Sequence, residues 1–301
     1  MILPAPLQPG DTIAIVATAR KVSPEEMQPA IEILKNWGLK VVAGPNLYKQ
    51  HKQFAGSDVE RAEDLQWALD NVAIKAVLFA RGGYGTVRII EAIDFSSFKN
   101  NPKWLIGFSD ITVLHSHIHS QLGVATLHAP MAINFVKTPE AVLAGLKQML
   151  FGNFNSVSCP AQLLNRTGNA KGVLVGGNLS LLYALSGTPS DINTNGKILF
   201  IEDLDEYLYH MDRMMMQLKH AGKLKKLAGL VVGGMSDMKD NTVPFGKTAE
   251  QIIAEHVAEF SYPVCFDFPA GHLVHNHSLV FGGEVFLEVN AETRLDFMPL
   301  A

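Results

Sequence analysis

The stretch WLIGFSDITVLHSHIHS, residues 104–120, changes its pattern halfway. It begins as a short apolar run, which is typical of a strand buried in a parallel sheet. It continues with apolar residues at Ile111, Leu114 and Ile118, the spacing of a helix with one buried face. A small hydroxyl, that of Ser109, lies at the corner between the two. The stretch therefore predicts a strand, a sharp turn and a helix.

The same alternation repeats on the N-terminal side of this unit. We predict strands at residues 12–17, 39–44 and 75–80, and helices at residues 24–37, 58–71 and 86–93. Capping boxes begin two of these helices, Ser23 with Glu26 and Ser57 with Glu60. Alternating strands and helices form a parallel sheet with helices on both faces. Residues 1–150 are therefore predicted to be one such α/β domain.

The pattern changes after residue 150. Residues 151–170 are rich in Asn, Gly and Ser and are predicted to be a linker. Residues 171–301 are predicted to form a second α/β domain with more antiparallel character, closed by strands at 263–268, 279–289 and 294–298. A chain of 301 residues is long for one domain, which agrees with this division.

Composition excludes several classes of protein. The net charge of −4 gives no support to nucleic-acid binding, which usually needs a basic face. No apolar run reaches the ~20 residues that cross a bilayer, and the N-terminus is a poor signal peptide. We therefore expect a cytoplasmic protein that binds neither nucleic acid nor membrane. Its two cysteines, Cys159 and Cys265, are too few for a disulfide framework.

Ser109 has two interpretations. Serine is a common helix N-cap, and this alone accounts for its position. It also resembles the nucleophile elbow G-x-S-x-G, although Ile111 replaces the second glycine. In that case the nearby helix N-terminus could stabilise negative charge on an intermediate.

The run RGGYG, residues 81–85, follows the strand at 75–80. A dinucleotide fingerprint counted from Gly83 and Gly85 needs a third glycine where Arg88 stands, so that match fails. A glycine cluster lets backbone N–H groups approach an anion or a developing oxyanion closely. A tight turn with no further role is an equally good interpretation.

A nucleophilic serine needs a base, and the base needs an orienting acid. His272 directly follows Gly271 in a loop between two predicted strands, where side chains often serve function. Glu202 stands at the end of the hydrophobic strand KILFIED, where a solvated surface role explains it poorly. The histidines at 115, 117 and 119 share one helix and are interpreted as structural, because no H-E-x-x-H pattern accompanies them.

Five motifs in this order and spacing, ARGGYG, GFSD, GGNLSLL, LFIED…DR and AGH…FGG, resemble those of the LD-carboxypeptidases. This family of serine peptidases includes the muramoyltetrapeptide carboxypeptidases. The resemblance implies an N-terminal domain like that of class I glutamine amidotransferases and a smaller mixed α/β C-terminal domain. It implies Ser109 as nucleophile, Glu202 as acid and His272 as base. It also implies an oxyanion hole from the backbone N–H groups of Gly83, or a neighbour in that loop, and of Asp110, with neither metal nor cofactor.

The resemblance further implies release of the terminal D-alanine from murein tetrapeptides in cell-wall recycling, by a protein that is often a homodimer. An anionic peptide needs local cations. Arg81 and Arg213 are candidates, because a guanidinium binds a carboxylate through two parallel hydrogen bonds. The residues predicted to bind substrate are Arg81, Tyr84, Asn178 and Arg213. Two alternatives stay open: hydrolysis of microcin C-type aminoacyl nucleotides, and non-catalytic anion or nucleotide binding.

Overall fold

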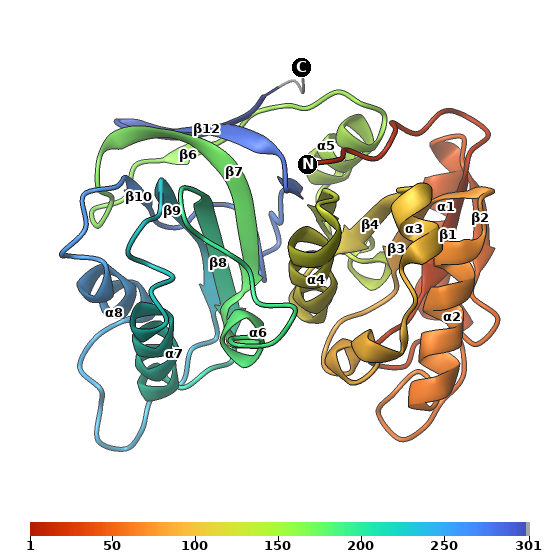
Figure 1. Cartoon of the computed structure of the whole chain (residues 1–301), viewed down its shortest axis with the longest axis horizontal. Coiled ribbons are helices and arrows are strands. Elements are labelled where there is room, and N and C mark those ends of the chain that lie inside the picture. The colour runs from red at the N-terminus through yellow and green to blue at the C-terminus, as the bar shows by residue number, and fades with distance from the viewer. Residues whose placement is uncertain (299–301) are drawn as a thin grey trace.

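The computed structural model describes residues 1–298 and consists of two lobes, each built on one β-sheet (Figure 1). The first lobe, in red to yellow-green, holds the start of the chain, and the second, in green to blue, holds most of the rest. Among the described residues, no helix combines the length and the apolar character that a membrane span requires. The predicted cytoplasmic location stays a prediction.

The first sheet has six strands in the order β11-β5-β4-β3-β1-β2. They are β1 (Thr12–Val16), β2 (Lys40–Ala43), β3 (Ile74–Phe79), β4 (Trp104–Gly107), β5 (Thr126–His128) and β11 (Leu279–Phe281). The first five run parallel, as predicted, and β11 joins antiparallel to β5. The mostly parallel sheet is therefore confirmed, with one strand supplied by the far end of the chain.

Helices cover both faces of the first sheet. They are α1 (Pro24–Asn36), α2 (Asp58–Asp70), α3 (Ser96–Asn100), α4 (Thr112–Leu122) and α5 (Glu140–Leu150). Alternate residues of a strand point to opposite faces. Ile13 and Ile15 accordingly pack in the core that α1 and α5 share, whereas Ala14 and Val16 pack in the core of α2, α3 and α4. Both predicted capping boxes are present.

The second sheet has seven strands in the order β10-β9-β8-β7-β12-β13-β6. They are β6 (Val157–Pro160), β7 (Gly168–Asn178), β8 (Ile198–Leu204), β9 (Gly229–Ser236), β10 (Val264–Cys265), β12 (Glu284–Val289) and β13 (Glu292–Phe297). Strands β7 to β10 pair in parallel and the others antiparallel, so the sheet is mixed, as predicted. The two edge strands of this sheet, β6 and β10, come close together. The sulfurs of Cys159 in β6 and Cys265 in β10 lie 4.0 Å apart, and Arg166 forms a β-bridge with Val264 of β10.

The second sheet has helices on one face and the first lobe on the other. One face carries α6 (Leu179–Ala184), α7 (Leu208–His220) and α8 (Ala249–His256). The other contributes Leu174, Phe200 and Val285 to the same buried cluster as Ile13 of the first lobe. This shared core joins the lobes and fixes the loops of one against the loops of the other.

Three local predictions are wrong. Residues 86–93 form two 3-10 turns, η1 (Thr86–Arg88) and η2 (Ile90–Ala92), because their many β-branched side chains disfavour an α-helix. The segment 151–170 contains β6, which pairing with β13 stabilises. The strand expected at 279–289 breaks at Gly282, where φ is +87°, into β11 of one sheet and β12 of the other.

Candidate active site

Ser109 occupies a strained turn between β4 and α4. Its φ of +60° is left-handed, which is rare for a residue other than glycine. A 3-10 turn, η3 (Ser109–Ile111), leads from it into α4. At Gly107 a Cβ would lie 2.9 Å from the Ile111 side chain, so glycine permits the close turn. Strain of this kind is typical of functional residues, and strand, strained serine and helix together have the geometry of a nucleophile elbow.

Glu202 and His272 form a close pair across the second lobe. The Nδ1 of His272 lies 2.6 Å from the Oε2 of Glu202, and the His272 backbone N–H donates to the same oxygen at 3.1 Å. Glu202 is fully buried in β8. Gly271 has a φ of +100°, and a Cβ there would approach the Glu202 side chain to 2.7 Å. The motif A-G-H therefore needs its glycine so that the histidine can reach the acid.

Burial lowers the pKa of His272, but the charge of Glu202, the hydrogen bond to it and the charge of Asp203 outweigh this effect. The pKa of His272 is consequently raised above 6.5. In a catalytic triad the acid makes this same contact with Nδ1, by which it orients the imidazole and stabilises its cation. The role of Glu202 as that acid stays a prediction.

The segment that carries Ser109 packs against His272. The ring of Phe108, the residue before Ser109, lies 4.8 Å from the His272 ring, centroid to centroid. Within residues 1–298 no hydrogen bond joins the Ser109 hydroxyl to His272. Catalytic contacts are often loose without substrate and tighten when it binds. The acid–base half of the predicted triad is therefore formed, and the nucleophile half is adjacent to it.

The glycine loop lies directly over Ser109. A Cβ at Gly82 would lie 3.1 Å from the Ser109 Cβ and 3.2 Å from its Oγ. Gly83, with a φ of +115°, instead lies against the side chain of Arg20. Gly82 is thus the glycine nearest the hydroxyl, and the sequence did not distinguish it from its neighbour. The oxyanion role of Gly83 and Asp110 stays a prediction.

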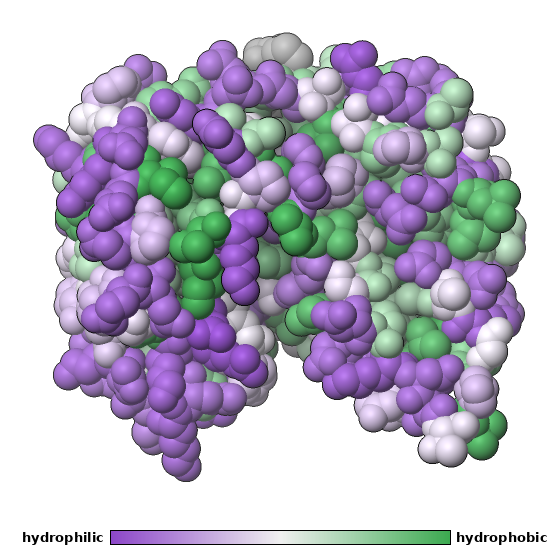
Figure 2. Space-filling model, turned by 180° about the vertical axis from the view of Figure 1, so that it is seen from behind, coloured by the Kyte–Doolittle hydropathy of each residue, from purple (hydrophilic) through white to green (hydrophobic). Residues whose placement is uncertain are grey.

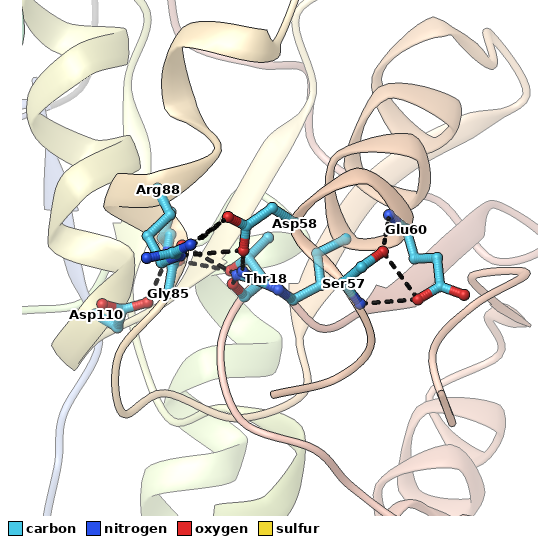
Figure 3. Close-up of polar contacts among 9 residues, drawn as sticks. Thr18, Ser57, Asp58, Glu60, Gly85, Arg88 and Asp110 are labelled. Atoms are coloured by element: carbon cyan, nitrogen blue, oxygen red, sulfur yellow. Dashed lines mark hydrogen bonds and ion pairs between the residues drawn. The ribbon is translucent and has the colours of Figure 1, made fainter. Parts of the chain in front are cut away.

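A buried polar network holds this loop in place (Figure 3). The Asp110 carboxylate accepts from the Thr86 N–H at 2.8 Å, and burial raises its pKa above 3.8. The Arg61 guanidinium donates to the Gly85 carbonyl at 3.0 Å and also to the Thr18 carbonyl. Asp58 binds Arg61 and accepts from Arg88 at 2.6 Å. The loop is therefore fixed before any ligand arrives.

Arg61 is a positioning residue that the sequence interpretation missed. It lies on the buried face of α2 with Leu65 and Ala68. The sequence did contain a signal, since Arg61 falls at helical spacing within the apolar face of α2. A charged side chain buried there requires several polar partners, which indicates a structural role. Asn276 was missed in the same way: its Oδ1 accepts from the Gly271 N–H at 2.7 Å and steadies the His272 loop.

The predicted substrate residue Asn178 uses its polar atoms inside the protein. Its side chain donates to Asp203 at 2.8 Å and accepts from the Leu181 N–H as the N-cap of α6. Its backbone N–H donates to the Thr112 hydroxyl at 2.9 Å. Because Thr112 begins α4, the motif G-G-N-L joins the nucleophile helix to β7 of the other lobe. A substrate contact for Asn178 stays a prediction.

The other predicted substrate residues lie at two separate places. Arg81, in the glycine loop, faces Glu26 at 3.8 Å, and the neighbouring Tyr84 is exposed. Arg213 stacks on the Tyr209 ring in a separate cavity on α7, which shares no lining residue with the cavity beside His272. The structure therefore does not bring Arg213 to His272.

The histidines of α4 are held by packing. His115 is buried, bonded to the Thr126 hydroxyl at 2.8 Å and the Gly107 carbonyl at 2.9 Å, and burial lowers its pKa to about 4. In the part of the chain that the structure describes, no group of three His, Cys, Asp or Glu side chains is arranged to hold a metal ion.

Sequence profiles and known proteins match this chain over most of its length. The sequence profile of the LD-carboxypeptidase N-terminal domain matches residues 13–129, and that of the C-terminal domain matches residues 171–287. A Bacillus subtilis protein named "Probable murein peptide carboxypeptidase" is 37% identical, over 96% of this chain and 92% of its own length.

Two further relatives widen the comparison. The crystal structure of muramoyltetrapeptide carboxypeptidase from Oxalobacter formigenes superposes with a TM-score of 0.86 at 31% identity, covering 96% of this chain and 99% of that one. The microcin C7 self-immunity protein of Escherichia coli is 26% identical over 77% of this chain and 78% of its own length. The chain belongs to the LD-carboxypeptidase family.

Proposed function

We propose that this protein is a serine carboxypeptidase that hydrolyses the L,D-peptide bond to the terminal D-alanine of murein tetrapeptides. The observation that carries the proposal is the 2.6 Å contact between buried Glu202 and His272, beside a serine at a φ of +60°. The murein peptide names of the relatives support the choice of substrate. A non-catalytic anion-binding role leaves the Glu202–His272 pair without a purpose.

The geometry supports acyl transfer in two steps. The Ser109 hydroxyl attacks the peptide carbonyl while His272 takes its proton, and the glycine loop and the Asp110 N–H face the developing oxyanion. His272 then donates that proton to the leaving amine, so the C–N bond breaks and a serine ester remains. A water molecule, deprotonated by His272, hydrolyses the ester and restores the Ser109 hydroxyl. Glu202 holds Nδ1 throughout both steps.

Incubation with purified murein peptides tests this function. We expect tetrapeptides to lose D-alanine and leave tripeptides, and pentapeptides ending in D-Ala-D-Ala to stay intact, as mass analysis will show. The pentapeptide is the matched control, because its terminal bond joins two D-residues. Comparable cleavage of both contradicts the L,D assignment. An inert tetrapeptide beside rapid hydrolysis of an aminoacyl adenylate points instead to the activity for which the Escherichia coli relative is named.

The pH dependence of kcat/KM follows from the raised pKa of His272. A general base must be neutral in the free enzyme, and a raised pKa keeps it protonated to higher pH. We expect kcat/KM to rise with pH and reach half its plateau above pH 6.5. Initial rates at low substrate concentration between pH 5 and 9 measure this. A half-maximum well below 6.5 contradicts the proposed role of the buried pair. The predictions of a homodimer and of activity without metal or cofactor stay predictions.

A further inference from the structure

A cavity of about 270 Å³ lies beside His272, between the two lobes. The end of β4 and the segment after β5 form one wall, and the end of β8 and the His272 loop form the other. Apolar side chains, among them Phe108, Leu204 and Leu273, make up much of the lining. Such a site favours a small group with an apolar part, and its few polar side chains determine the orientation of that group.

Lys137 supplies the positive charge of this cavity. Apart from His272 it is the one basic residue of the lining, and among the described lining residues there is no carboxylate. Lys137 is exposed, and within residues 1–298 its ammonium makes neither an ion pair nor a side-chain hydrogen bond. The amide of Asn134 lines the same wall. Its Oδ1 accepts from the Met131 N–H at 3.1 Å, and this orientation leaves the Nδ2 group as a donor for a ligand. The wall therefore presents donors to an anion.

The segment that carries Lys137 is tied to the catalytic loops. The Ile133 N–H donates to the Ala80 carbonyl at 3.0 Å, directly before the glycine loop. The Ala129 N–H donates to the Gly107 carbonyl at 3.1 Å, two residues before Ser109. Phe135 is buried and anchors the turn. These contacts set the base of the Lys137 side chain at a fixed place relative to the nucleophile.

The chemistry assigns this cavity to one side of the scissile bond. In acyl transfer the base protonates the leaving amine, so the leaving residue must lie next to His272. The cavity is on that side, because His272 is part of its wall. The D-alanine released in the proposed reaction bears a free carboxylate beside a methyl group, and Lys137 with Asn134 matches the carboxylate.

We propose that this cavity binds the leaving amino acid and that Lys137 pairs with its terminal carboxylate, an assignment that rests on the proposed function. Lys137 then restricts the enzyme to the last residue of the peptide. A peptide that ends in an amide, or that continues by a further residue, has no carboxylate at the position that Lys137 contacts. Neither Arg81 nor Arg213 lines this cavity, so neither substitutes for Lys137 there.

Binding to the inactive Ser109→Ala variant tests the subsite separately from turnover. The probes are a murein tetrapeptide and its C-terminal carboxamide, with affinities measured by calorimetry. We expect the free acid to bind about tenfold more tightly, the size of a charge-assisted contact in a partly desolvated site. Adding Lys137→Ala should remove this preference and leave amide binding unchanged, and Lys137→Arg should restore much of it. Lys99→Ala, which removes an exposed lysine outside the cavity, should change neither affinity.

The outcomes separate this proposal from the proposed function. If the acid and the amide bind equally, or if Lys137→Ala weakens both alike, the subsite is wrong even when the wild-type enzyme releases D-alanine. Equal weakening places the Lys137 contact on another carboxylate of the peptide. If the preference depends on Lys137 but the wild-type enzyme cleaves no tetrapeptide, the subsite stands and the proposed function is overturned.

Discussion

Ser109→Ala should lower kcat on murein tetrapeptides by roughly four to six orders of magnitude, because no other group can form the ester intermediate. KM and the unfolding transition should change little, since the side chain is small and makes no hydrogen bond that the fold depends on within residues 1–298. Single-turnover assays with stoichiometric enzyme measure the residual rate. Circular dichroism during thermal unfolding checks that the variant is folded.

Ser156→Ala is the matched control for this experiment, because Ser156 is an exposed serine in the segment before β6. It should leave kcat unchanged. If folded Ser109→Ala keeps near-normal turnover, the nucleophile is misassigned, and the left-handed turn at Ser109 has only a structural role.

Glu202→Gln should lower kcat by about three to four orders of magnitude, because a neutral amide neither stabilises the imidazolium nor fixes the tautomer of His272. It should also shift the rising limb of the pH profile to lower pH. Burial lowers the pKa of His272, whereas the charge of Glu202, its hydrogen bond and, to a smaller extent, the charge of Asp203 raise it. Loss of the two Glu202 contributions should therefore lower the pKa of His272. A purely structural role for Glu202 predicts no such shift. Rates at low substrate concentration across the pH range measure both effects.

Glu206→Gln is a close control, because Glu206 also binds a histidine, His210, at 2.6 Å. That pair is partly exposed and lies at the start of α7, with Glu206 just before the N-cap Tyr207 and His210 in the first turn, whereas Glu202 is fully buried. Glu206→Gln should leave kcat within about threefold of the wild type. If it proves more damaging than Glu202→Gln, the acid of the triad is misplaced.

The elements of the first lobe could be predicted from the sequence because their signals are local. The capping boxes at Ser23 and Ser57, the apolar runs and the spacing along α4 each involve residues within a turn or two of one another. The strained turn at Ser109 follows from the short stretch between β4 and α4. Local signals were insufficient at residues 86–93, where β-branched side chains and the Asp110–Thr86 bond outweigh an apparent helical pattern.

Sequence by itself determined the residue types available to the site: a serine at an elbow, glycines beside it, and a histidine and a carboxylate at later strand ends. Tertiary structure decided which of them meet. Glu202 and His272 are 70 residues apart, and their contact depends on how β8 and the loop before β11 are placed. Arg213 and Lys137 show the same limit. Arg213, one of the two arginines predicted for the substrate, lies in another cavity, whereas Lys137, which the sequence analysis did not single out, lines the cavity beside His272. The physical reason is that both lobes share one apolar core, whose packing sets distances between loops that no periodicity along the chain encodes.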